Sequence, residues 1–517
     1  MNRVENLHFR IETEYLEQIF LNMKTIKLIF VLTLILSAYK PSYSQKIITR
    51  EQALNIALES SPEIKQSRLN MEKNKEYLNA QLALLKSRFH LDITPINYSH
   101  TDQYDNSFSQ WFTSEKKETN ASLIVSQPIK FSDGSLTLRN DFGYKDNFSE
   151  RANEVFKDKG FDNNLYLAYN QPLFTYNKTK LDLERNQLNL ENATLAYSIE
   201  MLNMEYQVNQ AFYSIYQRQM ALEIAKEEFE NQKISKEIIQ SKVEGGLSAK
   251  EELYQAELNY ASSKSNLDNK EVELENAEDQ FKQLIGLSLY EDIQVSTDVD
   301  YIAVSVSLDK AIENGLTQRL ELSQKQIELN TSKFNLIETS ATNEFRGDVE
   351  LSLGIMGNNE KFGNIYGTPT NSPQFNVKFS IPIFDWGERK ARIRAAEIDV
   401  ESKEIDIQTL KDDIVINIRK IYRNLNNLIL QIEIAKQNEK NAQLTYEINL
   451  ERYRNGDLTS MDLELFQNQL SEKKMDLANS LINYKLELIN MKIQSLWDFE
   501  NNTSFVPKEL QENIREK

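Results

Sequence analysis

The sequence predicts a mainly α-helical fold with some β-structure, built as a tandem repeat of long coiled-coil helical hairpins with strands between their helices. Three observations lead to this prediction. Only 14 Gly and 9 Pro occur in 517 residues, which favours long uninterrupted helices. Two short motifs recur at one fixed offset. The apolar period also changes from helical to strand-like between the helical segments.

The tandem repeat rests on two pairs of similar segments. Gln171-Pro-Leu-Phe174 recurs as Ile381-Pro-Ile-Phe384, and Gly246–Leu253 recurs as Gly456–Leu463. Both pairs lie 210 residues apart (382 − 172 and 456 − 246). A single offset for both pairs is typical of a duplication without gaps over that stretch.

The first half of the chain carries additional residues. Ser61–Ile64 resembles Arg319–Leu322 at an offset of 258, which exceeds the other offset by 48 residues (258 − 210). We place the insertion within 98–169, where Ser132-Asp-Gly134 is a tight-turn signal. The sequence thus predicts an extra strand pair there. The expected domains are a first repeat at 45–290, a second repeat at 291–498 and a C-terminal tail at 499–517.

Two segments, 176–244 and 386–455, are almost free of Gly and Pro. At 1.5 Å per residue, either helix would extend roughly 100 Å. The second carries apolar residues at strict 4-3-4-3 spacing, the a/d seam of coiled-coil packing. Those residues are Ile414, Ile418, Ile421, Leu425, Leu428, Ile432 and Ala435, and Leu195, Ile199, Leu202 and Tyr206 begin the same pattern in the first segment.

Each long helix is expected to end at a short Gly-containing turn. Glu244-Gly-Gly246 ends the first and Asn455-Gly456 the second. Ser, Thr and Asp residues then cap a returning helix of about 35 residues. Each half is therefore predicted to form an antiparallel helical hairpin.

Strand-like alternation separates the shorter and longer helices of each half. In the second half it covers 349–355 and 375–381, which are joined by a loop rich in Gly, Asn and Pro at 357–373. The first half offers 89–98, 121–127, 136–144 and 165–169. One apolar and one polar face suit a transmembrane barrel, and they suit a soluble antiparallel sheet equally well. The alternation alone does not distinguish a transmembrane barrel from a soluble sheet.

The start of the chain reads as a targeting segment. Lys24 and Lys27 precede the apolar run Leu28–Leu36, and small residues follow near Ser44, as in a secretory signal peptide at 23–44. Residues 1–22 are expected to be an upstream extension from a misplaced start. After residue 45 no apolar stretch is long enough for a transmembrane helix, so entry into a membrane is expected through β-strands.

Composition excludes several function classes. A net charge of −18 without a basic stripe argues against nucleic-acid binding. The chain has no Cys, which excludes disulfides, thiol chemistry and N-terminal acylation. Its three histidines, His8, His90 and His100, lack metal-ligand spacing, and we find neither a phosphate-binding loop nor a nucleophile elbow. We therefore expect no enzyme activity, no metal and no cofactor.

Across about 47–497, the order and duplication of these features resemble the TolC family of outer-membrane efflux proteins. The family's strand-to-helix junction, a Pro, a hydrophobic residue and a Phe before small or polar residues, is matched by Pro172–Tyr176 and Pro382–Gly387. The resemblance implies a homotrimer that forms one α-barrel across the periplasm and one β-barrel, usually twelve-stranded, in the lipid of the outer membrane. It implies a passive export conduit in a tripartite efflux or type I secretion system, with a periplasmic adaptor (membrane fusion protein) and an inner-membrane transporter as partners.

By the same resemblance, the two hairpin tips form the periplasmic entrance and bind the adaptor. The tip residues are Gly245, Gly246, Leu247 and Ser248 in the first hairpin, and Asn455, Gly456, Asp457 and Leu458 in the second. Plain turn chemistry, with Gly present only to allow positive φ, explains the glycines equally well.

The family narrows its entrance with carboxylates after the second tip, where Asp462 and Glu464 stand here. Three copies around an axis would form an acidic ring that favours cations. An acidic residue early in a helix also interacts favourably with the helix dipole, which is the simpler explanation for Asp462.

The resemblance also assigns Tyr453 and Glu252 to a network that holds the entrance shut. An Arg that joins this network in some members is replaced by Leu458. An exposed Tyr and a solvated Glu remain the alternative. For the whole chain, the alternative function is a periplasmic coiled-coil scaffold or adaptor, which would normally have one hairpin and separate β-domains.

Overall fold

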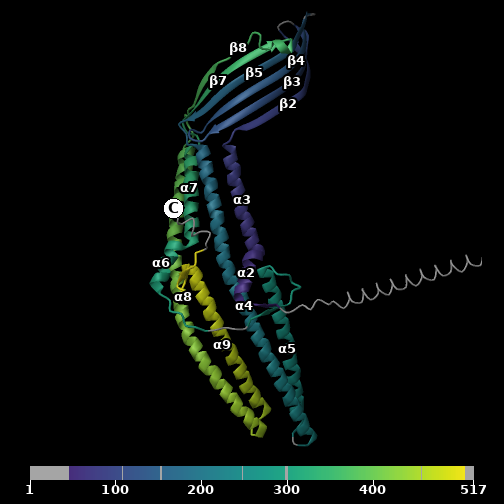
Figure 1. Ribbon diagram of the computed structural model, residues 1–517, viewed down its shortest axis with the longest axis vertical. Helices are drawn as coiled ribbons and strands as arrows, with labels where there is room; N and C mark the ends of the chain where they lie inside the picture. The colour runs from purple at the N-terminus through teal and green to yellow at the C-terminus, as the bar shows by residue number, and fades with distance from the viewer. Residues whose placement is uncertain are drawn as a thin grey trace, which may run out of the picture.

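The computed structural model of the protein describes residues 46–106, 109–151, 154–246, 248–296, 301–455 and 457–506. The molecule is elongated, with a curved sheet at one end and two helical hairpins running away from it (Figure 1). The predicted signal peptide and the segment before it lie outside the described residues, as do 507–517 of the predicted tail. Among the described residues, no helix is both long and apolar enough to cross a bilayer.

The two hairpins make up most of the molecule. α4 (Lys178–Glu244) and α5 (Lys250–Ile285) form the first, and α8 (Glu388–Asn455) and α9 (Ser460–Ser495) form the second. The long helices have 67 and 68 residues, and both returning helices have 36. The observed helices end at the predicted residues, and each starts two residues later than the sequence indicated.

Two shorter helices precede each hairpin. They are α2 (Arg50–Ser60) and α3 (Pro62–Leu84) in the first half, and α6 (Leu308–Gln318) and α7 (Leu320–Ser340) in the second. Thr49 and Gln52 form a capping box at the start of α2, which satisfies two N–H groups that the helix leaves without partners. α3 lies along α4 and α7 along α8 (Figure 1), so both halves have the same helical order.

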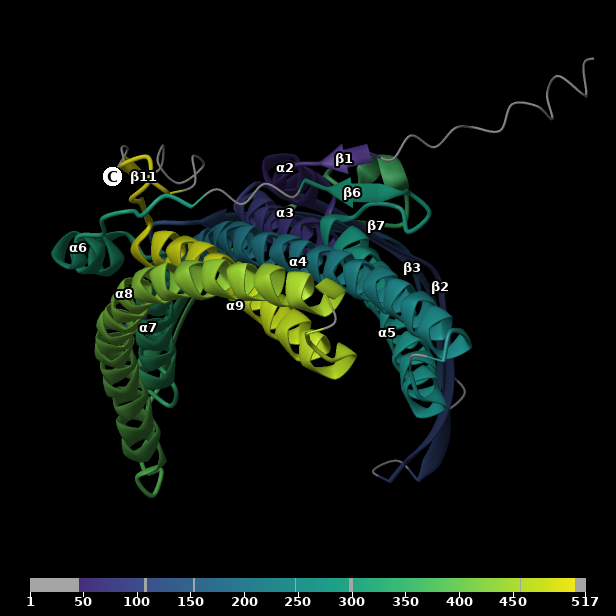
Figure 2. The same ribbon diagram turned by 90° about the horizontal axis from the view of Figure 1, so that it is seen from below.

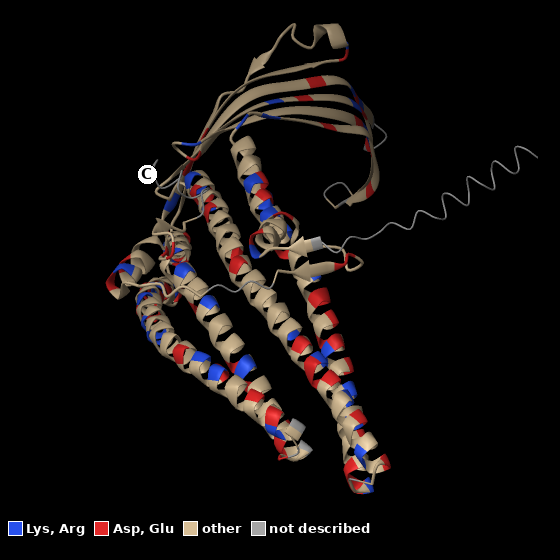
Figure 3. Ribbon diagram, turned by 60° about the horizontal axis from the view of Figure 1, so that its bottom comes forward, with Lys and Arg blue, Asp and Glu red and all other residues tan. Residues whose placement is uncertain are grey.

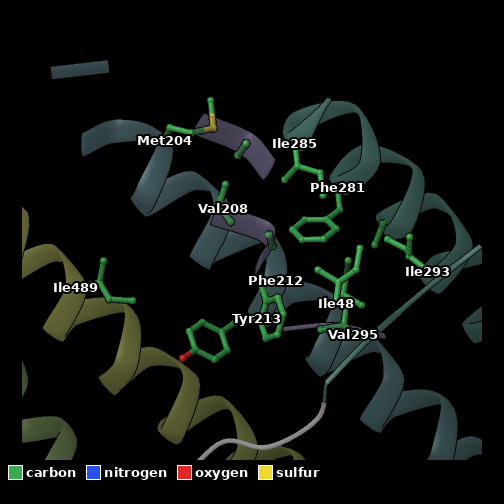
Figure 4. Close-up of a cluster of buried hydrophobic side chains, with 14 of the residues drawn as sticks. Ile48, Met204, Val208, Phe212, Tyr213, Phe281, Ile285, Ile293, Val295 and Ile489 are labelled. Carbon is green, nitrogen blue, oxygen red and sulfur yellow. The ribbon is translucent and has the colours of Figure 1, made fainter. Parts of the chain in front are cut away.

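The core consists of buried clusters where these helices meet. In the first half, Phe212 of α4 and Phe281 of α5 pack with Ile48, Ile293 and Val295 (Figure 4). The last three come from a parallel pair, β1 (Lys46–Ile48) and β6 (Ile293–Val295). In the second half the cluster joins α6, α8 and α9. The hydrophobic contribution to stability is therefore concentrated at mid-length and not at the tips.

The predicted a/d seam of α8 is confirmed as a buried stripe. Six of its seven residues are less than 9% exposed, and Leu428 packs at the margin of the same cluster. On α4, Leu195 and Leu202 are buried, while Ile199 and Tyr206 are partly buried. A period of 3.5 in the sequence therefore identified the packed face of each long helix.

The sheet is antiparallel and six strand positions wide within the described residues. Its order is β2 (Arg88–Asp105), β3 (Gln110–Ile129), β4 (Gly134–Arg151), β5 (Glu154–Leu173) and β7 (Arg346–Asn359), followed by β8 (Thr370–Asn371) and β9 (Gln374–Ser380). β8 and β9 pair with one side of β7 in a single register, so they form one interrupted strand. Over the described part of the chain, the sheet thus ends in two free edges, β2 and β8–β9.

The strands of the first half are longer than the alternating segments suggested. The sequence indicated 89–98 and 121–127, whereas β2 and β3 span 18 and 20 residues. Most of the additional residues are polar or charged, so these parts of the strands lack the apolar alternation that the prediction used. In the second half, β7 extends three residues into the predicted loop at 357–373, and that loop also contains β8 and a 3-10 turn, η1 (Phe362–Asn364). After α9, β10 (Trp497–Asp498) and β11 (Thr503–Ser504) pair antiparallel.

The two faces of the sheet differ in polarity. Strand pairing aligns apolar side chains on one face from β2 to β9, and most of them are exposed. The opposite face carries mainly Ser, Thr, Asn and charged residues. Charged residues of both signs are frequent along the hairpins and sparse over most of the sheet (Figure 3). A sheet that exposes an apolar face requires a non-aqueous environment or a partner on that side.

Candidate functional site at the hairpin tips

The first tip is a tight turn between α4 and α5. Gly246 has a φ of +72°, and a Cβ added to it would meet no other atom within 4 Å. This left-handed conformation explains the glycine by backbone chemistry. Gly245 has a φ of −78°, which any residue adopts, so turn geometry does not explain it. Ser248 lies beyond the turn, and Leu247 is outside the described residues.

The second tip lies between α8 and α9. The N–H of Asp457 donates to the carbonyl of Arg452 over 2.9 Å, which closes the turn. Asn455 and Asp457 are exposed, and Leu458 is partly buried, whereas Gly456 is outside the described residues. Both predicted tips therefore lie at the ends of the hairpins farthest from the sheet (Figure 1).

Asp462 is exposed in the first turn of α9, where it takes part in a helix cap. Its N–H donates to Thr459 Oγ1 (3.2 Å), and the Thr459 hydroxyl donates to its Oδ2 (2.7 Å). This reciprocal bonding at a helix start, together with the helix dipole, favours a carboxylate here. The capping role and a pore-lining role use different lone pairs of the same carboxylate, so they are compatible.

Glu464 has a different environment, because it connects the two hairpins. Its Oε2 accepts a hydrogen bond from Asn259 Nδ2 of α5 over 2.9 Å. Burial, followed by the nearby charge of Glu464, raises the pKa of Glu228 on α4, and a hydrogen bond from Asn266 opposes this shift. Glu464 thus belongs to a contact of α4, α5 and α9. Sequence reasoning missed Asn259 and Glu228, because residues more than 200 positions apart share no local pattern.

Tyr453 is 9% exposed and packs against α4. Its hydroxyl lies 3.5 Å from Ser235 Oγ, and Lys242 Nζ lies 5.8 Å from the centre of its ring. Glu252 is exposed in the first turn of α5. Within the part of the chain that the structure describes, no hydrogen bond joins Tyr453 to Glu252. Tyr453 is thus in place to hold the second hairpin against the first.

Further polar contacts connect α4 with α9 above the tips. Gln217 Nε2 donates to Asn479 Oδ1 (2.7 Å), and Lys474 pairs with Glu227 (3.4 Å). Closer to the sheet, Lys492 pairs with Glu205 over 3.1 Å. Because such contacts exchange with water at low cost, the two hairpins are joined more loosely here than in the apolar core. Over the described residues, no group of three or more metal-ligating side chains was found.

A family model matches part of this arrangement. Residues 316–492 match the outer membrane efflux protein family. The matched stretch runs from the end of α6 through the second half of the sheet into α9. Over this stretch, about a third of the chain, the protein is therefore similar to outer-membrane efflux proteins.

Solved structures of outer-membrane channels share the fold over nearly the whole chain. The CmeC channel of Campylobacter jejuni is 16% identical with a TM-score of 0.68, covering 90% of this chain and 88% of that one. VceC of Vibrio cholerae is 13% identical with a TM-score of 0.61, covering 86% of this chain and 95% of that one. The MtrE channel of Neisseria gonorrhoeae is 12% identical with a TM-score of 0.61, covering 88% of this chain and 90% of that one. No match was found among curated proteins.

Proposed function

We propose that three copies of this efflux protein form one continuous duct, an α-barrel across the periplasm continued by a β-barrel in the outer membrane. The observation that carries the proposal is the pair of free sheet edges, β2 and β8–β9. Unpaired backbone N–H and C=O groups are too costly in lipid, so the edges must pair with other copies. The edges lie at opposite ends of one sheet, which suits a head-to-tail ring.

The helices support the same assembly. Seen from below, they form an arc with α8 at one end and α5 at the other (Figure 2). On α8, Ile405, Leu430, Ile434 and Ile448 are between 59% and 63% exposed. On α5, Tyr254, Leu258 and Val272 are between 56% and 67% exposed. These apolar surfaces lose contact with water if α8 of one copy packs on α5 of the next.

Such a duct is a passive conduit in a tripartite efflux or type I secretion system. A periplasmic adaptor binds the tips at Gly245–Ser248 and Asn455–Leu458, and an inner-membrane transporter supplies the energy. Asp462 of three copies forms an acidic ring at the entrance, with Glu464 behind it, and Tyr453 and Glu252 participate in its closure. The predicted repeats at 45–290 and 291–498 are the two units of each copy. A periplasmic scaffold is disfavoured, because both hairpins follow strands of one shared sheet.

The assembly is tested by extracting the protein from the outer membrane of its host in mild detergent and weighing it by mass photometry. We expect three times the mass of one chain. Leu430→Lys combined with Ile434→Lys should shift the mass to that of a single chain, because charges would be buried between copies. Gln431→Lys, on a neighbouring exposed face of α8, is the matched control and should leave the trimer intact. A monomeric wild-type protein would overturn the proposal.

A further inference from the structure

We propose that the inserted strands β3 and β4 are part of the membrane wall, so that a closed ring of three copies has eighteen strands and a correspondingly wider pore. This inference rests on the proposed three-copy duct. The described residues of each copy supply six strand positions, so three copies supply eighteen strands. A chain with only two strands in each of its two repeats would supply four, and three copies would then form a barrel of twelve. Because barrel diameter grows roughly linearly with strand number, the pore becomes about one and a half times as wide.

The first support is the position of the insertion. β3 pairs with β2 from Arg88↔Ser126 to Asp105↔Gln110, and β4 pairs with β5 from Ser135↔Asn170 to Arg151↔Glu154. The two strands therefore lie between β2 and β5 along their whole length. Since backbone hydrogen bonds join all four strands, the hairpin cannot move out of the wall without opening the sheet.

The second support is the polarity of the two faces. Register places Val125 of β3 beside Phe89 of β2, and Leu138 of β4 beside Leu167 of β5. Val125 and Leu138 also pair with each other, so the apolar belt continues across the insertion without a gap. The exposed belt residues on these two strands are Leu123 (45%), Leu136 (37%) and Leu138 (42%). A soluble surface hairpin would have no need of such a belt.

The opposite face of the insertion is polar. Ser122 and Ser126 of β3 alternate with the belt residues, as do Thr137 and Arg139 of β4. Arg139 Nε donates to Asp141 Oδ1 over 2.7 Å on that face. Charged groups on the lipid side of a barrel are destabilising, most strongly at mid-depth. The polar face must therefore line water, which makes it pore wall.

The third support is the attachment of the insertion to the helices. The N–H groups of Lys178 and Thr179, at the start of α4, donate to the carboxylate of Asp133 over 3.2 and 2.9 Å. In the second half, the N–H of Arg389 donates to Asp385 over 3.1 Å. Thr179 and Arg389 are 210 residues apart, the offset of the repeat, and the residue at the matching place of Asp385 is Thr175.

The turn of the inserted hairpin thus supplies the carboxylate that the first half lacks at its own junction. At the other side of the turn, Gln127 Nε2 donates to the carbonyl of Leu85 at the end of α3 (2.8 Å), and the hydroxyl of Ser87 donates to Gln127 Oε1 (2.6 Å). The insertion therefore fills the space between the end of α3 and the start of α4, where the wall meets the helices.

Aromatic residues lie at both ends of the apolar belt, at the inserted turn and the neighbouring junctions on one side and on β4 on the other, as is usual for outer-membrane strands. Phe131 in the turn is 88% exposed, and the junction residues Phe174 and Phe384 are 63% and 71% exposed. Midway along β4, the ring of Phe142 lies 5.7 Å from that of Phe362 in the β7–β8 loop, measured between ring centres. A loop of the second half thus packs on an inserted strand.

An insertion of two strands also preserves the rest of the wall. β2 and β5 run antiparallel to each other in this order, and their apolar residues lie on the same face. One extra strand would reverse the chain direction, whereas a pair returns the chain to the same edge. The barrel consequently widens without any change in the helices below it.

Cysteine labelling in intact outer-membrane vesicles tests the wall assignment directly, since the chain has no native Cys. A membrane-impermeant maleimide should label Ser122→Cys and Thr137→Cys, which face the pore. Labelling should be lost at the adjacent lipid-facing positions, Leu123→Cys and Leu138→Cys, the matched controls. Equal labelling of all four variants would place the hairpin in water and overturn the inference. Mass photometry of each variant reports the trimer separately, so a failure of the proposed assembly is recognised as such.

The width is tested with a variant in which an Asn-Gly turn replaces 106–153, joining β2 to β5 directly. Thr175→Asp is included to replace the carboxylate that Asp133 supplies to the start of α4. In planar bilayers, polymers of increasing size added on the barrel side should enter the full-length channel up to a larger size than the shortened one. An identical size limit for two trimeric channels would overturn the inference. If the shortened chain does not assemble, the labelling of the cysteine variants still decides whether β3 and β4 belong to the membrane wall.

Discussion

The two halves of the chain differ in the sheet and agree in the helices. α4 and α8 have 67 and 68 residues, and α5 and α9 have 36 each. The first half, however, supplies four long strands and the second half β7 with the interrupted β8–β9 strand. A helical hairpin packed side by side with its twin must match it in length, because a shorter one leaves apolar seam residues exposed. A sheet can gain a pair of strands without exposing apolar residues of its neighbours, because the new strands pair with both of them.

The halves also differ in how their long helices begin. Asp385 caps α8 from the adjacent junction, and hydrogen bonds from the N–H groups of Gly387 and Arg389 hold its pKa below the ordinary value. α4 receives its carboxylate from Asp133, which lies 45 residues upstream of Lys178 (178 − 133) on another strand turn. Equivalent helix ends can therefore be stabilised by residues in non-equivalent places.

The largest expected effect concerns the helical cores. Ile418 of α8 is fully buried, and a Cβ on Gly315 of α6 would lie 2.6 Å from its Cδ1. Ile418→Ala should cost about 2–5 kcal/mol per chain. Val208, at the matching place on α4 (418 − 210) and also fully buried, loses one carbon fewer, so Val208→Ala should cost roughly 0.8 kcal/mol less.

The loss is measured as the thermal midpoint of the helical circular-dichroism signal in detergent. Arg419→Ala, at an exposed neighbouring position, serves as the control and should leave the midpoint near that of the wild type. If Val208→Ala lowered the thermal midpoint more than Ile418→Ala, the two helical cores would not contribute to stability in proportion to the apolar carbons that each substitution removes.

An intermediate effect is expected at the helix starts. Asp133→Ala removes a cap from α4 and should cost about 0.5–2 kcal/mol. Adding Thr175→Asp to this variant should recover part of the lost midpoint, because it places the carboxylate where the second half has Asp385. Asp385→Ala should lower the midpoint as well, and Thr175→Asp should not rescue it. An Asp133→Ala protein as stable as the wild type would show that the insertion does not support α4.

The smallest effect is a pH dependence at the contact between the hairpins. Burial and the charge of Glu464 raise the pKa of Glu228 above its ordinary value, so the folded state binds this proton more tightly than the unfolded chain. The resulting stabilisation is present below the unfolded pKa of about 4.3 and is lost as the pH rises through the folded pKa. Glu228→Gln should therefore raise the thermal midpoint at pH 7 and leave it unchanged near pH 4.

Glu230→Gln is the control for this measurement, since Glu230 is exposed and pairs with Lys233 three residues along the same helix. Surface pairs of this kind contribute little, so its midpoint should follow the wild type at both pH values. If Glu228→Gln raised the thermal midpoint by the same amount at pH 4 as at pH 7, the charge of Glu228 would not be the cause of the higher midpoint.

Sequence patterns located most of the fold and only part of the candidate site. The 4-3-4-3 spacing on α8 identified the buried seam, and the Gly-containing turns identified where both hairpins reverse. The same reasoning ended β2 too early and began β3 too late, because most residues at the outer ends of both strands are polar or charged. At the entrance it named Tyr453 and Glu464, but not Ser235 and Asn259, which contact them. The acidic ring, the adaptor contacts and the repeat boundaries stay predictions.

The sequence by itself determined the features that depend on neighbouring residues: long helices where Gly and Pro are scarce, turns where glycine allows positive φ, and a stripe of apolar residues on each helix. The tertiary structure alone decided that β3 and β4 lie between β2 and β5, that Asp133 caps α4, and that Glu464 reaches Asn259. Such contacts follow from strand register and from how the hairpins pack. Both are set by the summed burial of many residues far apart in the chain, which no local pattern records.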